Sequence, residues 1–379
     1  MHGATVKNAI FLITDARFAK ITGAVGKRLA RQWECDVHVF VEDENADLVD
    51  VPGGSDIRVH RNKIKASLPR NIPLYERWPH IVFLRCFATT LLKDYDRLLY
   101  LDADILCERA DQSIWGIELA DAGLGAVTDA ATIDRAPLAT GLPRAEWLSR
   151  IGVSSDRYFN AGVMLIDPAR LDCEMVNRKL AHYYDDRHFA GIKSQDFFNH
   201  AFDGRWTELN PRWNYQPPFF ELGLDGWIDP VFLHFCSSNK PWFFPDNPGA
   251  SGSRLEHEKA FFEILEEAGI SPHEVAASAQ HKKSNAHYRT SKMLRARLRA
   301  TLSRFGVRMG KERRARATWL AQRRKMIDYL NTAHRDGRFA DALARSTHPP
   351  LTSDLKFDGR KLWLQHSPQM PDERPLAAN

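Results

Sequence analysis

The stretch Leu98-Leu-Tyr-Leu-Asp-Ala-Asp104 joins a short apolar run to two aspartates that are separated by one residue. An apolar run of this length predicts a buried strand. Two carboxylates at the end of a strand can both reach one divalent cation, and oxygen ligands suit Mg²⁺ and Mn²⁺. An isolated Asp-x-Asp pair is more often a turn with two solvated aspartates. The strand in front weakens that alternative, because it fixes both side chains at the edge of a sheet.

The same pattern recurs on both sides of this stretch. Alternating strands and helices predict an α/β fold with an open sheet, in which ligands bind beyond the carboxyl ends of the strands. We therefore expect four aspartates to share one rim of the sheet: Asp15, Asp102, Asp104 and Asp129. The predicted strands cover 9–14, 37–41, 57–60, 98–101 and 124–128, and the predicted helices cover 18–33 and 80–93.

The composition is that of a globular protein. The 379 residues are 44% hydrophobic, which is enough to bury a core, and the formal net charge is only +5. The five cysteines are widely spaced without a Cys-x-x-Cys pair, so they support neither a zinc knuckle nor a disulfide framework. No run of about 18 apolar residues occurs that could span a membrane. We expect a cytoplasmic protein, free or held peripherally on the inner face of the cytoplasmic membrane.

The chain changes character twice after the predicted sheet. From about 130 to 250 it is irregular and rich in Trp, Pro and Asn, and long ordered loops of this kind commonly build binding sites. Within 281–325, sixteen Lys or Arg residues face a single acid, Glu312. We expect a catalytic domain over 1–250, a helical basic extension over 251–346 and a Pro-rich, flexible tail over 347–379.

His234 follows the apolar run 231–233 and lies six residues before Lys240. A histidine in this position is more often a packed core residue than a ligand. A neutral imidazole can, however, complete a metal site beside two carboxylates, and this mixed set favours Mn²⁺ over Mg²⁺. A lysine on the same loop can contact phosphate as a point charge.

Taken in order, these motifs resemble those of glycosyltransferase family 8, which includes glycogenin, bacterial lipopolysaccharide glucosyl- and galactosyltransferases, and plant galacturonosyltransferases. The likeness covers about residues 8–243. Each motif is weak alone, whereas the ordered combination is specific. The motifs are Asp15 with Phe18, Arg85, Leu-Asp-Ala-Asp104, Phe159-Asn-Ala-Gly-Val163, Gln195-Asp196, Trp213-Asn214 and His234 with Lys240-Pro-Trp242.

The resemblance implies a GT-A fold, which is a Rossmann-like open mixed sheet. It also implies transfer of a hexosyl group, with retention, from a UDP-sugar. Asp102, Asp104 and His234 would hold the cofactor, Mn²⁺ or Mg²⁺. The acceptor would be a saccharide or a lipid-linked saccharide, in the synthesis of bacterial cell-surface polysaccharide or lipopolysaccharide.

The resemblance further implies donor-binding roles. Asp15 would bind the nucleobase or the ribose. Phe18 stands where the family usually has a Tyr that packs on uracil, and its ring keeps the stacking but loses the hydroxyl. Arg85 would contact the donor sugar or the diphosphate, and Lys240 would hold the diphosphate. Asp129 is placed to touch the donor sugar.

Three residues are the catalytic candidates: Asn160, Gln195 and Asp196. Asn160 and Gln195 would line the sugar, with Gln195 closest to the reacting face. An amide oxygen is a weak nucleophile, and no other side chain is an obvious covalent one. We therefore favour a front-face route through an oxocarbenium-like state. The leaving phosphate would deprotonate the acceptor, and the Gln195 carbonyl would shield the cation.

Two positions depart from the family pattern. Ser194 stands where the family often has an Asp, and a serine cannot act as a carboxylate. Ser237 stands where a Gly is favoured, and a Gly lets backbone approach phosphate closely.

Purely structural roles also stay open for five residues. Asn160 could cap a turn before a strand at 163–166, Arg85 could be a surface helix residue, Gln195 could cap a helix, Phe18 could be core only, and Asp129 could be a turn residue.

Two other classes of function remain as alternatives. The first is a haloacid-dehalogenase-like phosphotransferase that uses Asp102 as its nucleophile. In that group the motif normally closes the first strand of the domain, whereas here it lies about 100 residues into the chain. The second is a non-catalytic protein that binds a sugar nucleotide, which the intact set of Asp102, Asp104, His234 and Lys240 disfavours.

The basic stretch 281–325 interleaves cations with apolar residues at roughly helical spacing. This pattern suits contact with an anionic membrane surface, near which each cation contributes up to about 1 kcal/mol. The alternative is a solvated basic helix without a partner. No set of stacking aromatic residues accompanies the charge, so we expect no nucleic acid partner.

Overall fold

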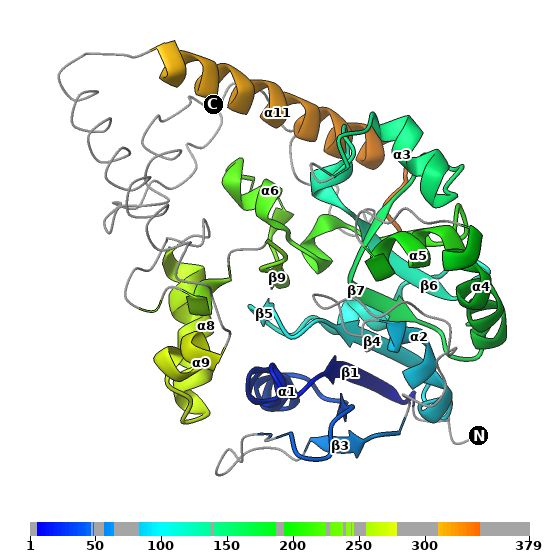
Figure 1. Ribbon diagram of the computed structural model, residues 1–379, viewed down its shortest axis with the longest axis vertical. Helices are drawn as coiled ribbons and strands as arrows, with labels where there is room; N and C mark the ends of the chain where they lie inside the picture. Colours follow the sequence, from blue (N-terminus) through cyan, green and yellow to red (C-terminus); the bar gives the residue numbers. More distant parts are fainter. Residues whose placement is uncertain are drawn as a thin grey trace.

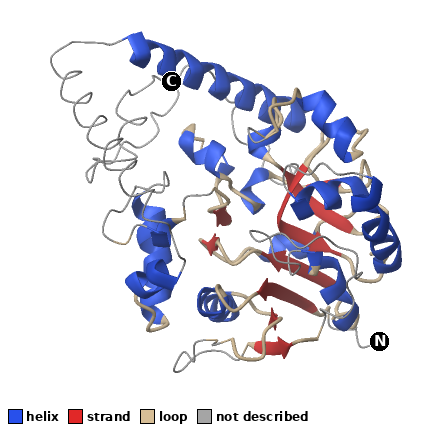
Figure 2. Ribbon diagram, in the orientation of Figure 1, coloured by secondary structure: helices blue, strands red, loops and turns tan. Residues whose placement is uncertain are grey.

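The computed structural model of the protein has a mixed seven-stranded sheet at its centre. The strand order is β3-β2-β1-β4-β7-β6-β8. The first four strands run parallel, whereas β7 runs antiparallel to both β4 and β6 (Figures 1 and 2). The strands are β1 (Asn8–Thr14), β2 (Asp36–Val41), β3 (Arg58–Arg61), β4 (Arg97–Leu101), β6 (Leu124–Thr128), β7 (Phe159–Ile166) and β8 (Thr207–Glu208). The structure describes residues 6–46, 48, 57–63, 83–137, 140–186, 193–224, 228–237, 240–243, 245, 255–278 and 310–341.

Helices cover both faces of this sheet (Figure 2). The sheet is therefore buried on both sides, and its strands are continuous apolar runs rather than alternating ones. In β1, Ile10 and Leu12 belong to one core cluster, and Ala9 and Phe11 belong to the other. The helices are α1 (Ala19–Gln32), α2 (Arg85–Ala88), α3 (Arg144–Ile151), α4 (Cys173–Asp186), α5 (Lys193–Ala201), α6 (Pro217–Glu221), α8 (Leu255–Glu267), α9 (Pro272–Ser278) and α11 (Gly310–Arg335).

The predicted α/β fold and all five predicted strands are confirmed, but one helix is shorter than expected. Within the described part of 80–93, α2 spans four residues and a 3-10 turn follows at Thr89–Leu91. The hydroxyl groups of Thr89 and Thr90 donate to the carbonyl oxygens of Cys86 (2.6 Å) and Phe87 (2.7 Å). Such bonds compete with the helical ladder and are typical of residues where a helix ends.

The region 130–250 is more regular than its composition suggests. Its described residues contain four α-helices and also β7, which begins at Phe159 rather than at the expected residue 163. Between Ala126 and Val127 the register of β6 against β7 shifts, and residues Ala161 to Val163 of β7 have no partner on β6. Irregularities of this kind are common next to active sites because they re-aim side chains.

A small second sheet pairs β5 (Ile105–Cys107) with β9 (Phe232–His234) in an antiparallel arrangement. Ile105 lies opposite His234, and the amide of Phe235 donates to the carbonyl oxygen of Asp104 (3.0 Å). This pairing joins the chain just after the Asp-x-Asp stretch to a segment about 130 residues later in the sequence.

The C-terminal helices pack onto the same core as the sheet. Phe261 of α8 and Met326 of α11 belong to the core cluster that contains Ile10 of β1. Beyond α11, Arg338 pairs with the buried Glu208 of β8 (2.8 Å), and the Asp341 carboxylate accepts from the Trp213 indole (2.6 Å). The division at residues 250 and 346 stays a prediction, and residues 281–309 and 347–379 lie outside the described ranges. Among the helices that are described, none has the length and apolar character needed to cross a bilayer.

Candidate active site

Asp102, Asp104 and His234 converge at the carboxyl end of β4. One side-chain ligand atom from each residue lies within 4.8 Å of the other two. The Nε2 atom of His234 is 3.3 Å from the Asp104 carboxylate and 3.8 Å from that of Asp102. Within the parts of the chain that the structure describes, this is the one group of three such side chains arranged to hold a metal ion. Two hard oxygen ligands and one imidazole suit Mn²⁺, and also Mg²⁺.

The β5–β9 pairing produces this convergence. Asp104 directly precedes β5, and His234 ends β9, so the antiparallel register places the two residues at the same end of the small sheet. Asp102 follows β4, and its amide donates to the carbonyl oxygen of Gly162 on β7 (2.8 Å). The three ligands therefore depend on backbone pairing between three distant segments.

Gly162 is required by the closeness of these groups. A methyl group at this position would lie 2.1 Å from Cε1 of His234 and 2.9 Å from Oδ2 of Asp102. Only a residue without a side chain allows β7 to pass beneath the imidazole and the carboxylate. Gly162 was part of the quoted motif, although no role could be assigned to it from the sequence.

Arg85 orients Asp102. Its guanidinium donates to the Asp102 carboxylate (3.1 Å) and to the carbonyl oxygen of Ala161 (2.8 Å), and it lies over the ring of Tyr100. The Tyr100 hydroxyl donates to the same Asp102 oxygen. The Arg85 side chain is only 10% exposed, so its interpretation as a surface helix residue is wrong. Burial alone would lower the pKa of Arg85, but the Asp102 carboxylate together with Tyr100 and Cys86 raises it above its usual value.

Lys240 lies against the metal ligands. Its ammonium group is paired with the Asp104 carboxylate and donates to the carbonyl oxygen of Phe235 (2.7 Å). Burial would raise the pKa of Asp104, but the Lys240 ammonium group and the adjacent His234 imidazole hold it well below its usual value. Asp104 is therefore an anion at neutral pH, as a metal ligand must be.

His234 is oriented from behind by Asn214. The Nδ1 atom of His234 lies 3.0 Å from Oδ1 of Asn214, which can only accept, so Nδ1 carries the proton of the neutral ring. This leaves the lone pair of Nε2 directed toward the two carboxylates. A hydrogen-bond partner on the far ring nitrogen is typical of metal-binding histidines.

A second cluster of buried polar side chains adjoins this set. The Nδ2 group of Asn214 donates to Oδ1 of Asn160 (3.0 Å), and Nδ2 of Asn160 donates to Asp129 (3.2 Å). Gln195 donates from Nε2 to the same Asp129 oxygen (2.8 Å), and its Oε1 accepts from the amide of Ala161 (3.1 Å). Four residues form this amide network: Asp129, Asn160, Gln195 and Asn214. They link His234 to the strand end of β6.

The environment of this network shifts the pKa of Asp129 upward. Burial is the largest cause, and the hydrogen bonds from Gln195 and Asn160 oppose it only in part. Asn160 lies inside β7, so its interpretation as a cap before a strand at 163–166 is wrong. Asp129 does act as a turn residue, because its carboxylate accepts from the amide of Ala131 (3.0 Å) at the start of a 3-10 turn.

The remaining candidates are more peripheral. Asp196 is completely buried, and its carboxylate accepts from the Tyr158 hydroxyl (2.7 Å). Asp15 follows β1, accepts from the amide of Arg17 (3.0 Å) and pairs with the Arg17 guanidinium (2.8 Å). The ring of Phe18 packs edge-to-face on Trp242 (6.4 Å between centroids) and is partly buried against the core.

Like Gly162, Tyr100 and Asn214 received no role from the sequence. Tyr100 precedes the Asp-x-Asp stretch, and its hydroxyl position depends on which way the strand faces. Asn214 lies in a quoted motif, but its partner His234 is 20 residues away. No local spacing rule connects the two, so only the folded chain reveals their contact.

Several bacterial proteins of known sequence are similar to this chain. It is 28% identical over 178 residues to general stress protein A of Bacillus subtilis. This match covers 42% of this chain and 58% of that protein. It is 26% identical over 185 residues to lipopolysaccharide 1,3-galactosyltransferase of Salmonella typhimurium, covering 46% and 52% respectively. The chain spans about half the length of the curated relatives it matches.

Solved glycosyltransferases share the fold. The crystal structure of the galactosyltransferase LgtC with donor and acceptor sugar analogs matches with a TM-score of 0.51 at 22% identity, covering 69% of this chain and 95% of that one. The bifunctional glycosyltransferase WbbM matches with a TM-score of 0.52 at 17% identity, covering 72% and 51%. These likenesses confirm the GT-A fold. The sequence model of glycosyl transferase family 8 matches residues 35–245, more than half of the chain, and the chain therefore belongs to glycosyltransferase family 8.

Proposed function

We propose that this chain is a retaining, metal-dependent hexosyltransferase that moves a sugar from a UDP-sugar to a saccharide or lipid-linked acceptor. The convergence of Asp102, Asp104 and His234 is the observation that carries this proposal. Relatives named as lipopolysaccharide galactosyl- and glucosyltransferases support a place in bacterial cell-surface polysaccharide or lipopolysaccharide synthesis.

The three candidate ligand residues fit Mn²⁺ or Mg²⁺. Asp102, Asp104 and His234 would hold the ion, Asp104 is anionic, and the Nε2 lone pair of His234 faces the carboxylates. Such an ion supplies charge neutralisation to the donor diphosphate. Arg85 and Tyr100 keep Asp102 in position for it.

Lys240 then has a role beyond its present ion pair. A divalent cation held by Asp102, Asp104 and His234 would weaken the attraction of Asp104 for this ammonium group. Lys240 would then be available to bind the diphosphate and to stabilise the charge that develops on it. Asp15 and Phe18, beyond the end of β1, would contact the ribose and the base.

The amide network would form the wall that faces the donor sugar. Asn160 and Gln195 are each held by hydrogen bonds, and the Gln195 amide is fixed at both its oxygen and its nitrogen. A fixed amide is a poor nucleophile, which supports a front-face route in which the leaving phosphate takes the acceptor proton. A trapped glycosyl-enzyme on Gln195 or Asp196 would overturn this route. Because Asp196 is completely buried against Tyr158, its contribution would be to hold the helix that carries Gln195.

A donor screen tests the proposal. The full-length protein would be incubated with a panel of UDP-sugars, with Mn²⁺, Mg²⁺ or a chelator, and released UDP would be measured. We expect release from at least one UDP-sugar, which the chelator abolishes and Mn²⁺ restores. Absence of metal-dependent release across the whole panel would count against the proposal.

The two alternative functions are not favoured. Family membership and the GT-A fold argue against a haloacid-dehalogenase-like phosphotransferase that uses Asp102 as its nucleophile. A radiolabelled phosphoenzyme, lost in Asp102→Asn, would revive that alternative. A non-catalytic sugar-nucleotide binding protein would bind UDP-sugars without releasing UDP, so the same screen separates the two.

Contact with an anionic membrane through 281–325 also remains part of the proposal. In the described part of that stretch, Arg314, Arg316 and Arg324 are exposed on α11. Deleting 281–379 would remove core residues of α11, so charge reversal is the cleaner test. We expect the Arg→Glu triple variant at these positions to sediment less with anionic liposomes than the wild type. Equal sedimentation of both proteins would contradict this contact.

A further inference from the structure

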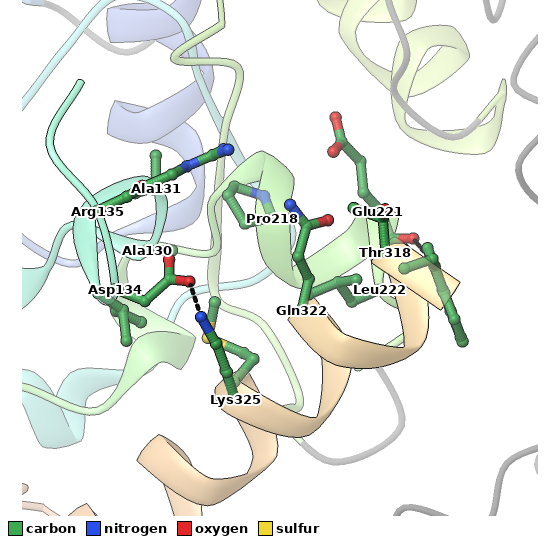
Figure 3. Close-up of a pocket in the computed structure, with 13 residues that line it drawn as sticks. Ala130, Ala131, Asp134, Arg135, Pro218, Glu221, Leu222, Thr318, Gln322 and Lys325 are labelled. Atoms are coloured by element: carbon green, nitrogen blue, oxygen red, sulfur yellow. Dashed lines mark hydrogen bonds and ion pairs between the residues drawn. The ribbon is translucent and has the colours of Figure 1, made fainter. Parts of the chain in front are cut away.

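A solvent-open cavity of about 350 Å³ lies between α11, α6 and the segment from Ala130 to Arg135. Figure 3 shows its walls, with Gln322 reaching from α11 toward Pro218 of α6 and the Lys325–Asp134 ion pair (2.7 Å) on one side. Its volume is at the lower end of the range for small-molecule sites, about 300 to 1,000 Å³. There is room for a terminal sugar unit rather than for a long polymer.

The cavity is joined to the amide network through the chain. Asp129 belongs to that network, and the next two residues, Ala130 and Ala131, line the cavity. The amide of Ala130 donates to the Gln216 side chain (2.9 Å), which fixes this segment against the start of α6. One continuous stretch of chain therefore forms part of the donor-sugar wall and part of the cavity wall.

The chemistry of the lining suits an uncharged carbohydrate. Its ionisable side chains are two acids, Asp134 and Glu221, and two bases, Arg135 and Lys325, and burial raises the pKa of Glu221 to about 7. The Gln322 amide and these groups offer both donors and acceptors, as sugar hydroxyls require. Trp319 adds an aromatic ring. A hydrogen bond from its indole N–H to the carbonyl oxygen of Glu221 (3.1 Å) holds this ring in place.

One wall of the cavity is formed by a segment that lies outside the part of the chain matched by the family model. The family match ends at residue 245, whereas Thr318, Trp319, Gln322 and Lys325 lie on α11. That helix is held rigidly, because Met326 and Leu330 are buried and the segment after it is anchored to Glu208. A wall that is both rigid and separate from the family core is suited to select among acceptors.

We propose that this cavity binds the terminal, uncharged sugar of the acceptor, and that α11 determines which acceptor is used. The inference rests on the proposed glycosyltransferase activity and names the acceptor side of the same site. Gln322 is the central specificity residue, since its amide extends into the cavity from α11.

The test measures acceptor kinetics with the UDP-sugar found in the donor screen. Acceptor probes would be methyl glycosides of neutral hexoses and common neutral disaccharides, with glucose 6-phosphate as the charged probe. The variants are Gln322→Ala, which removes the amide, and Gln322→Trp, which fills the cavity. Ala321→Trp is the matched control, because Ala321 is exposed on the same helix outside the cavity lining.

We expect both Gln322 variants to raise the KM for the best neutral acceptor about tenfold, with the KM for the UDP-sugar changed less than about twofold. The control should change neither constant. Unchanged acceptor KM values in both variants, or a preference for glucose 6-phosphate, would overturn the assignment of the cavity. A wild-type protein that releases no UDP from any donor would instead overturn the proposed function.

Discussion

The two halves of the candidate site are stabilised in different ways. The metal half consists of the partly accessible Asp102 and Asp104 and the buried His234, with the cations Arg85 and Lys240 beside them. The other half is the amide network, whose members are at most 8% exposed and hydrogen-bond one another. Charged groups near solvent can exchange partners, whereas buried amides must keep theirs, because an unsatisfied amide costs about 1–3 kcal/mol.

The two halves are therefore suited to different tasks. The metal half is suited to accept and release an ion and a diphosphate during each turnover. The amide half is a preorganised surface that does not rearrange when charge develops on the sugar. Asn214 joins the two halves, since it bonds to both His234 and Asn160.

Asp102→Asn and Asp104→Asn should have the largest effect. Each change removes an anionic ligand while keeping the side-chain shape, so UDP release should fall by about 10² to 10³-fold or more, with little loss of stability. Asp121→Asn is the matched control, because Asp121 is exposed at the opposite end of the sheet, before β6. Activity within tenfold of the wild type in both variants would show that the metal half is not the catalytic centre.

Gly162→Ala tests the close packing beneath the metal half. The added methyl group would collide with His234 and Asp102, so these ligands must move apart. Mn²⁺ affinity, measured by titration calorimetry, should fall about 100-fold. Gly116→Ala is the control, since a methyl group there meets nothing within 4 Å, and it should bind Mn²⁺ normally. Equal affinities in the two variants would contradict the geometry.

Asn214→Ala tests the connection between the halves. Loss of the bond to Nδ1 frees the His234 ring to rotate or change tautomer, and Mn²⁺ affinity should fall about tenfold. Asn214→Asp keeps the acceptor for His234 but loses the donor to Asn160. We therefore expect Asn214→Asp to retain more metal affinity than Asn214→Ala. The reverse order would mean that Asn214 acts mainly through the amide network.

Asp129→Asn should have the smallest effect, one that depends on pH. Because burial raises the pKa of Asp129 in the folded state, the neutral carboxyl contributes stability that is fully present below about pH 4. This contribution is lost as the pH rises through the folded pKa, at about 1.4 kcal/mol for each unit by which the pKa is raised. In urea unfolding, the free energy of unfolding of the wild type should increase relative to that of the variant as the pH is lowered from 7 to 5. A pH-independent difference would mean that Asp129 titrates normally.

Much of this arrangement could be predicted from local sequence. Apolar runs give the strands of a doubly covered sheet, and an aspartate directly after such a run must lie at its carboxyl end. The site of Asp102 and Asp104 follows from seven consecutive residues. The lengths of α2 and β7 could not be predicted as well, because threonine hydroxyls end the first and a register shift lets the second extend to Asn160.

The strands, the acidic rim and the candidate ligands could be read from the amino-acid sequence, since they depend on apolar periodicity and on residue chemistry. The orientation of these side chains became visible only in the folded chain. Arg85 supports Asp102 from a buried position, Gln195 is fixed at both ends, and α11 forms a wall beside the Asp129 segment. These outcomes depend on pairings between residues distant in sequence, such as β5 with β9 and α11 with α6. Such pairings form only where backbone and side-chain groups must be satisfied together inside one core.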